Sequence, residues 1–545
     1  MARLVLGPLL RYAGSTQATV WVETDAPCEV AVLGHHARTF HVEGHHYALV
    51  VVDDLEPASV TPYEVLLDGE PAWPRDDERP PSAIHTRHHE RRARLVFGSC
   101  RVGAPQRPPY TLATDEHPEA FEVDALWALS RRLQAGREPW PDCLLLLGDQ
   151  VYADEVSPET LAFIRSRRDV SQPPGDEVAD FEEYTRLYRE SWSDPDIRWL
   201  LSTVPSTMIF DDHDVHDDWN ISDAWVQEMR EKPWWEERIV GAFMAYWLYQ
   251  HLGNLSPPEL ADERLAAELH ADADGGPRLR RFAHNADRES AASRWAFHRD
   301  FGRSRLVVVD SRAARVLTSG RRDMVDEAEW SWIAEKARGA YDHLIVASTL
   351  PVFMVKGIHY LEAWDEALCA GAWGGIAARA GEGLRRALDL DHWPAFQRSF
   401  GTMVALLAEL ARGGGDEPPA TITLIGGDVH TAYVAEVALG RGQRSRVHQV
   451  VCSPFRNPLP SRERRMVRLM STRAVGAALR ALARTAGVAR PAADWRFLSG
   501  PTFDNSVAVL ELDQRAARIT VSRSGPEDED GPALSALHTR VLSAG

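Results

Sequence analysis

Short apolar runs that stop at a polar or ionisable residue recur through the middle of this chain. The runs are LVFG (95–98), CLLLLG (143–148), TMIF (207–210), LVVV (306–309), LIVA (344–347) and ITLIGG (422–427). They alternate with helical patterns such as those of residues 120–134 and 328–341. This alternation predicts an α/β domain with buried strands. Because ligands bind outside the carboxyl ends of strands in open α/β sheets, we expect the residues that follow the runs to meet in one crevice.

The residues that follow these runs are rich in groups that bind metal ions. In FGSC, GDQVYAD, FDDHDVHDDWN and GGDVHTAY, thiol, phenol, carboxylate and imidazole groups come directly after an apolar run. So many carboxylates in one crevice would repel each other strongly, and bound cations would relieve that repulsion. The mixture of ligand types suits a transition metal with a second, harder ion beside it. Each residue alone has a simpler explanation: Asp310 as a helix N-cap, or Cys100 as a small buried apolar residue.

The N-terminal segment has a different texture. Short apolar runs at 18–24, 28–34, 47–55 and 61–69 are separated by turn residues, which predicts a small antiparallel β-sandwich over residues 1–88. A Pro-rich, charged stretch over 71–92 is typical of a linker.

The remaining chain is expected to form one large domain over residues 93–523. Residues 223–300 and 359–413 are mostly helical by pattern and are interpreted as insertions or covering helices, with tryptophans that pack in a core or line a cleft. The acidic stretch SGPEDEDGPALS predicts a flexible tail over 524–545.

Charge and hydropathy exclude several partners. The formal net charge of −19 argues against sequence-specific binding of nucleic acid. No apolar stretch approaches the roughly 18–20 residues that span a bilayer. The first 24 residues make a poor signal peptide and contain no twin-arginine pair, so we expect a cytoplasmic protein. The five scattered cysteines do not indicate a disulfide framework. The sequence does not indicate an oligomeric state.

The motifs together resemble those of a known family. FGSC (97–100), GDQVYAD (148–154), FDDHDVHDDWN (210–220) and GGDVHTAY (426–433) are similar to motifs of the alkaline phosphatase D-type (PhoD-like) enzymes, a branch of the calcineurin-like metallophosphoesterase superfamily. The resemblance covers most of residues 4–520. It implies a β-sandwich followed by an α/β/β/α sandwich with helical insertions. It also implies a metal-dependent hydrolase of phosphate esters, either a phosphodiesterase or a phosphomonoesterase, that uses a metal-activated water.

The resemblance also implies a set of metal ligands. Asp149 would bridge two metals, and Tyr152 would give a phenolate to the first, which favours Fe³⁺. An acid replaces the family's usual Asn in DDHD (211–214) and again at Asp218, which leaves the second metal open. Ca²⁺ fits its oxygen ligands, and another divalent transition-metal pair is the alternative. The implied ligands are Cys100, Asp149, Tyr152, Asp211, Asp212, Asp218, Asp428 and His430.

Catalytic roles follow from the same comparison. His213 occupies the position of the family's phosphate-contacting histidine and is a candidate general acid. Arg101 and Arg456 are candidates for neutralising the phosphoryl oxygens, and Arg312 is a third that also has a structural interpretation.

Three questions stay open at the level of sequence. The Arg-rich segment 461–490 could contact a polyanionic or lipid-phosphate substrate as a peripheral surface, or could be a surface helix paired with acidic neighbours. The chain could be a catalytically silent protein that binds a phosphate ligand on the same fold. It could also be a metalloenzyme of other chemistry, such as an oxidase, although the carboxylate-rich second site argues against this.

Overall fold

Two mixed β-sheets form the centre of the protein. The computed structural model describes residues 1–75, 78–87, 92–318, 320–413, 417–528 and 531–545. The first sheet has the strand order β13-β12-β11-β23-β24-β25, and the second has the order β14-β15-β18-β19-β21-β20-β22. The strands of the first sheet are β11 (Arg92–Gly98), β12 (Cys143–Leu147), β13 (Ser206–Ile209), β23 (Ser506–Asp513), β24 (Ala516–Asp528) and β25 (Gly531–Ala544). Those of the second are β14 (Phe297–Phe301), β15 (Ser304–Val309), β18 (His343–Ser348), β19 (Thr421–Gly426), β20 (Ala432–Ala438), β21 (Arg446–Val451) and β22 (Asp494–Thr502).

The six apolar runs of the sequence all form strands of these sheets. β11 pairs in parallel with β12, and β12 with β13. In the second sheet β15, β18 and β19 are likewise parallel neighbours. Their carboxyl ends therefore lie along one edge of each sheet, which confirms the prediction that the residues after the runs come together.

Three buried apolar clusters lie between the successive layers of the main domain. The domain is therefore a four-layer α/β/β/α sandwich. Leu95 of β11 and Leu306 of β15 belong to one buried cluster, which lies between the two sheets. Leu144 of β12 faces the other way and packs with helices on the outside of the first sheet. Val307 of β15 packs with the helices on the outside of the second sheet. Strands buried on both faces explain why the runs lack polar alternation.

Helices cover both faces and fill the two insertions. The first insertion lies between β13 and β14 and the second between β18 and β19. The helical prediction for 223–300 extends too far, because its last residues belong to β14. The helices before and within the first insertion are α1 (Ala125–Gln134), α2 (Pro158–Arg167), α3 (Phe181–Trp192), α4 (Pro195–Thr203), α5 (Asp223–Arg230), α6 (Trp235–Ala245), a π-helical turn (Tyr246–His251), α7 (Leu252–Asn254), α8 (Pro257–Asp262), α9 (Arg264–Ala271), α10 (Gly276–Arg288) and a 3₁₀ turn (Ser290–Ala292). The later helices are α11 (Glu327–Ala337), α12 (Lys356–Cys369), α13 (Gly375–Ala387), a 3₁₀ turn (Trp393–Ala395), α14 (Gln397–Arg412), α15 (Ser461–Met470) and α16 (Arg473–Thr485). None of these helices, within the described residues, is long and apolar enough to cross a lipid bilayer.

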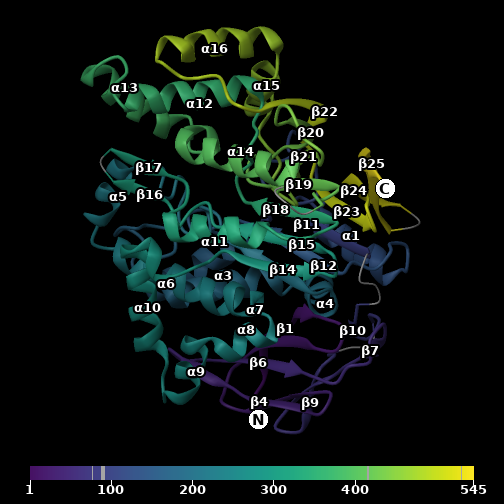
Figure 1. Cartoon of the computed structure of the whole chain (residues 1–545). Coiled ribbons are helices and arrows are strands. Elements are labelled where there is room, and N and C mark those ends of the chain that lie inside the picture. Colours follow the sequence, from purple (N-terminus) through teal and green to yellow (C-terminus); the bar gives the residue numbers. More distant parts are fainter. Residues whose placement is uncertain (76–77, 88–91, 319, 414–416, 529–530) are drawn as a thin grey trace.

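The N-terminal segment is a small β-sandwich at one end of the molecule (Figure 1). One of its sheets has the order β1-β2-β6-β5 and the other β4-β3-β8-β9, and a buried apolar cluster includes residues of both. Its strands, with the small pair β7–β10, are β1 (Leu4–Ala13), β2 (Ala18–Thr24), β3 (Glu29–Val32), β4 (His35–Arg38), β5 (Phe40–Val42), β6 (His45–Val52), β7 (Val60–Pro62), β8 (Val65–Leu67), β9 (Glu70–Trp73) and β10 (Ala83–His85). A second small pair, β16 (Val316–Thr318) with β17 (Arg321–Asp323), lies in the main domain. The boundaries at 88 and 93 stay a prediction, since residues 88–91 lie outside the described residues.

The prediction of a flexible tail over 524–545 was wrong for the residues that the structure describes. β24 and β25 form an antiparallel hairpin that extends the first sheet. Ile519, Val521 and Leu542 from these strands are buried in the core between the two sheets. The pairing of β24 with β25 and the burial of these apolar residues, and not the acidic composition, therefore determine the state of the described part of the segment.

Candidate metal centre

The residues predicted to bind metal lie in loops that directly follow four parallel strands. Cys100, Asp149, Asp211 and Asp428 each stand two residues beyond the last residue of β11, β12, β13 and β19. Backbone contacts hold the loops against each other across the two sheets. The backbone N–H of Cys100 donates to the Gly148 carbonyl (3.3 Å), and that of Asp428 donates to Ser99 Oγ (3.0 Å). Because these contacts involve residues directly after the strands, the sheets fix the relative position of the loops.

Several of these residues have a left-handed backbone. The φ angles are +55° at Cys100, +48° at Asp149, +62° at Asp428 and +44° at His430. Residues other than glycine seldom adopt this region, which costs on the order of 1–3 kcal/mol and is concentrated at functional sites. The left-handed backbone turns each chain sharply after its strand.

Glycines allow the loops to approach this closely. Gly148 has a φ of +96°, and a Cβ there would lie 2.5 Å from Asp211 Cβ. A Cβ on Gly427 would lie 2.2 Å from Ser99 Oγ. A side chain at either position would separate the loops that carry the predicted ligands.

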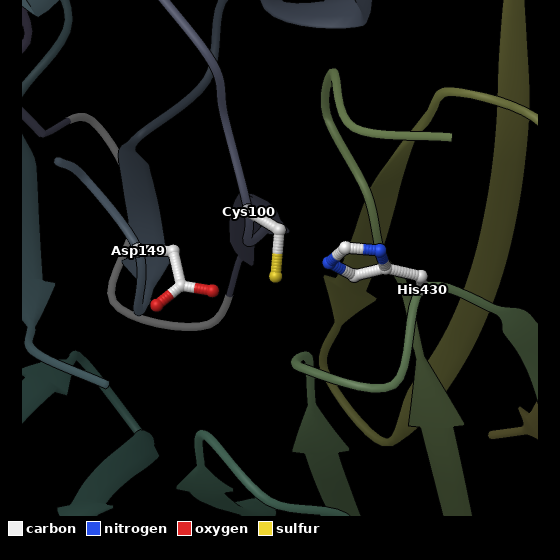
Figure 2. A group of neighbouring side chains, drawn as sticks. All are labelled: Cys100, Asp149 and His430. Carbon is white, nitrogen blue, oxygen red and sulfur yellow. The ribbon is translucent and has the colours of Figure 1, made fainter. Parts of the chain in front are cut away.

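The loops bring two groups of candidate ligands together, and the groups share Asp149. Ligand atoms of Cys100, Asp149 and His430 all lie within 4.8 Å of one another, as do those of Asp149, Asp211 and Asp212. Figure 2 shows Cys100 between Asp149 and His430, with the sulfur and the carboxylate directed into the same space. Thiolate, imidazole and carboxylate suit a transition metal, whereas three carboxylates suit a hard cation.

The electrostatics of these groups fit bound cations. Asp149 Oδ1 and Asp211 Oδ2 are buried and have no hydrogen-bond partner among the described residues. Burial, together with the charges of Asp149 and Asp428, raises the pKa of the Cys100 thiol. Burial and neighbouring carboxylates likewise raise the pKa of Asp149, against the effect of His213. Burial lowers the pKa of His430 to about 4, which leaves the neutral imidazole that binds metals. A cation would supply the missing partner for each of these atoms.

Arg312 is the protein's own counter-charge to the carboxylates. Its Nη2 lies 3.2 Å from Asp212 Oδ1 and 3.4 Å from Asp428 Oδ1. The same buried guanidinium also pairs with Asp211 and Asp391. Arg312 contacts three loops of the site. These contacts agree with the structural interpretation of this residue.

His213 is held at the edge of the site by Asp154. Its Nδ1 lies 3.0 Å from each of the two Asp154 carboxylate oxygens. Burial lowers the pKa of His213, but the charge of Asp154 and its hydrogen bond outweigh this and raise the pKa well above its ordinary value. The ring also packs beside Tyr152, with 5.0 Å between the ring centres. The contact with Asp154 fixes the orientation of the imidazole.

Three predicted ligands are near the site but outside the two groups. The Tyr152 hydroxyl accepts a hydrogen bond from Asn457 Nδ2 at 3.1 Å. The Asp218 backbone N–H donates to Asp212 Oδ2 at 3.3 Å. The Asp428 carboxylate contacts His392 as well as Arg312. Their roles as metal ligands stay a prediction.

The structure does not bring Arg101 and Arg456 to the carboxylate groups. Arg101 donates to Asp124 Oδ2 at 2.8 Å and to the Ser191 carbonyl at 2.7 Å. The Arg456 guanidinium donates to backbone carbonyls, including that of Tyr110 at 3.2 Å. The role of these arginines in neutralising a phosphoryl group stays a prediction. Arg101 thus binds the N-cap residue of α1 and the end of α3, Arg456 binds loop backbone, and neither lines the cavity beside the carboxylates.

Sequence reasoning missed residues from the second insertion. His392 lies with Nδ1 2.8 Å from Glu362 Oε1 and Nε2 3.1 Å from Asp428 Oδ2. Asp391 contacts Arg312 and Arg315. The signal was present in LDLDHWP (388–394), where acids and a histidine are as dense as in the other motifs. No buried apolar run precedes it, so the strand-end argument did not reach it.

A cavity of about 350 Å³ opens beside the site. Its polar lining comes from both ligand groups and from the missed residues. These residues include Asp149, Asp212, His213, His392, Asp428 and His430. The volume is within the usual range of small-molecule sites, about 300–1,000 Å³.

Comparison with known proteins gives an independent assignment. A family model described as PhoD-like phosphatase matches residues 129–486, and one described as a domain of unknown function (DUF7800) matches residues 1–85. A solved structure titled "Structure of PhoD" has a TM-score of 0.57 and 12% identity, covering 99% of this chain and 92% of that chain. A maltogenic amylase from S. marinus has a TM-score of 0.17 and 10% identity, covering 95% of this chain and 76% of its own chain. This similarity is too low to indicate a shared fold. No curated protein matches the sequence.

The solved structure shows a shared fold, and the family model agrees with the site. The match over 129–486 spans more than half of the 545 residues and includes Asp149, Asp211 and His430, although it begins after Cys100. The strand-end loops, the acidic cluster and the matched segment thus all lead to one conclusion: the chain belongs to the PhoD-like phosphatase family.

Proposed function

We propose that the protein is a metal-dependent hydrolase of phosphate esters whose reaction centre is the pair of ligand groups that share Asp149. The observation that carries this proposal is the close approach of Cys100, Asp149 and His430 to each other, and of Asp149 to Asp211 and Asp212. Membership of the phosphatase family supports the same class of reaction.

The two groups differ in the metal that they would hold. Cys100, Asp149 and His430, with Tyr152 as a further ligand, favour Fe³⁺. Asp149, Asp211 and Asp212 offer only oxygen, as would Asp218 and Asp428, and oxygen ligands favour Ca²⁺. Another pair of divalent transition metals is the alternative. When bound, such ions polarise the phosphoryl oxygens and lower the pKa of water toward neutrality.

His213 is proposed as the proton donor to the leaving group. Asp154 holds Nδ1, so Nε2 is the nitrogen that can face a substrate in the cavity. In hydrolysis a water oxygen bonds to phosphorus in line with the leaving oxygen, whose bond to phosphorus breaks. The proton on Nε2 would pass to that leaving oxygen, as general acid catalysis requires.

The test is turnover of a chromogenic diester and of the matching monoester. We would measure release of p-nitrophenol from bis(p-nitrophenyl) phosphate and from p-nitrophenyl phosphate, with and without chelator. The proposal expects turnover that chelator removes and added metal restores, and the preferred ester decides between phosphodiesterase and phosphomonoesterase. Absence of turnover of either ester, in protein shown to contain metal, would instead favour a silent phosphate-binding protein on this fold.

Two further expectations from the sequence also stay proposals. Contact of segment 461–490 with an anionic surface is supported by Arg462, Arg465 and Arg468, which are exposed on α15. Loss of binding to anionic vesicles after charge removal would support it, and unchanged binding would refute it. The cytoplasmic location would be tested by cell fractionation.

A further inference from the structure

Helices α12 and α15 and the loop after α13 contribute a group of apolar side chains to the cavity beside the ligand groups. This apolar wall consists of Ile358, Leu361, Leu388, Met466, Val467 and Met470. Glu362, Asp389 and Glu463 of the same segments also line the cavity. In Figure 1 the helices α12, α15 and α16 lie at the end of the molecule opposite the N-terminal sandwich. A ligand whose phosphate sits at the ligand groups would therefore place its alcohol part against this wall.

The wall is a built feature of the fold. A Cβ on Gly357 of α12 would lie 2.5 Å from the Met470 carbonyl, so the glycine allows the end of α15 to approach α12. Arg464 Nε donates to the Leu459 carbonyl at 2.5 Å, and its Nη2 lies 3.5 Å from Glu122. These contacts hold α15 in place although none of its described residues is buried.

The apolar side chains of the wall are open to water. Met466 is 45% exposed and Leu388 is 42% exposed. Apolar surface that gathers at a cavity with a few convergent polar groups is typical of a ligand site. Covering these side chains with an apolar ligand would remove their contact with water, which is favourable.

The charge of the lining excludes a strongly anionic alcohol. None of the described residues around the cavity is Lys or Arg, whereas Asp217, Asp389 and Glu463 are among them. An alcohol with further phosphate groups would meet these carboxylates, and no Lys or Arg of the described lining would offset their charge. An uncharged apolar alcohol meets no such repulsion.

We propose that the substrate is a phosphate ester whose alcohol carries an apolar chain or ring, and that the α12–α15 wall binds this apolar part. The inference rests on the proposed function and names its substrate class. Met466 is the residue of the wall most suited to a test, because it is exposed and its replacement leaves the core unchanged.

The experiment varies the alcohol and keeps the phosphate constant. Two series would be used: p-nitrophenyl alkyl phosphodiesters and alkyl phosphate monoesters, each from ethyl to hexyl, with phenyl esters as the ring-bearing arm. Burial of a methylene group is worth about a fourfold change in binding. Because the wall is partly open, we expect about twofold per methylene, hence at least about tenfold in kcat/KM from ethyl to hexyl.

The variants Met466→Ser and Leu469→Ser separate the wall from the rest of the helix. Leu469 lies on the same helix and is 56% exposed, but it does not line the cavity. Met466→Ser should lower the preference for hexyl over ethyl at least about threefold, with the melting temperature unchanged. Leu469→Ser should leave the preference unchanged. Equal kcat/KM across both series, or equal effects of the two variants, would overturn the inference.

Binding of alkyl phosphonates, which are not hydrolysed, separates this inference from the proposed function. Tighter calorimetric binding of hexyl than of ethyl phosphonate without turnover of any ester would refute the hydrolase and support the wall. Turnover that does not depend on the alcohol would support the hydrolase and refute the binding of an apolar group by the wall. A larger gain for phenyl than for hexyl would assign the wall to a ring, and the opposite order would assign it to a chain.

Discussion

His45 connects the N-terminal sandwich to the main domain through two carboxylates. Its Nδ1 lies 2.8 Å from Glu23 of β2, and its Nε2 lies 2.8 Å from Glu182 of α3. Burial by itself lowers the pKa of His45, but the hydrogen bonds and charges of Glu182 and Glu23 outweigh it and raise the pKa to about 9. The folded protein therefore holds a proton on His45 that the unfolded chain releases above its ordinary pKa of 6.5.

This difference sets the size and the pH range of the effect. The gap between 6.5 and about 9 corresponds to about 3 kcal/mol of stability. Because the Glu182 side chain is 42% exposed, solvent screening reduces the expected value to about 2 kcal/mol. A folded-state pKa that is raised stabilises the fold fully below about pH 6.5, and the contribution is lost as the pH rises through about 9.

The assay compares wild type with His45→Gln by urea denaturation at several pH values. The difference in unfolding free energy should be about 2 kcal/mol larger at pH 6 than at pH 10. His36→Gln is the control, because His36 is an exposed histidine of the same sandwich that pairs with Glu29 of its own domain. A difference for His45→Gln that stays constant from pH 6 to pH 10 would refute the reasoning.

Three further substitutions test the close packing and the arginine assignment. Gly427→Ala should destabilise the protein by about 2 kcal/mol, because its Cβ would lie 2.2 Å from Ser99 Oγ. Gly401→Ala on helix α14 meets nothing within 4 Å and should stabilise by up to about 1 kcal/mol, so equal melting temperatures of the two variants would contradict the account. Arg101→Gln should cost about 3–5 kcal/mol, since it leaves Asp124 buried without its ion pair, while KM for an ester substrate stays unchanged. A stable Arg101→Gln variant with a raised KM would place this arginine at the phosphate after all.

The sequence predicted the structure best at positions where burial restricts the choice of residue. A strand covered on both faces must be apolar throughout, so the runs before Cys100, Asp149, Asp211 and Asp428 were visible as strands. Parallel pairing then forces their ends to one edge, which is why the candidate ligands could be predicted as a cluster from their positions in the chain.

Side-chain direction and long-range pairing could not be predicted in this way. Arg101 follows Cys100 directly, yet its guanidinium pairs with Asp124. His392 reaches Asp428 from a short segment between helices, and only the folded insertion shows this contact. In the segment predicted as a flexible tail, Leu542 is buried in a strand, β25, that pairs with β24. In each case a tertiary contact, and not a local pattern, decides the outcome.

The central claim is that two metal positions share Asp149. The most direct test is to measure metal content per chain by mass spectrometry, together with ester turnover, in wild type and in Asp149→Asn. Asp169→Asn, an exposed carboxylate remote from the site loops in sequence, is the control. The account predicts two metal ions in wild type and in the control, and loss of both ions and of turnover in Asp149→Asn, because the residue belongs to both ligand groups. Full metal content and retained turnover in Asp149→Asn would contradict it.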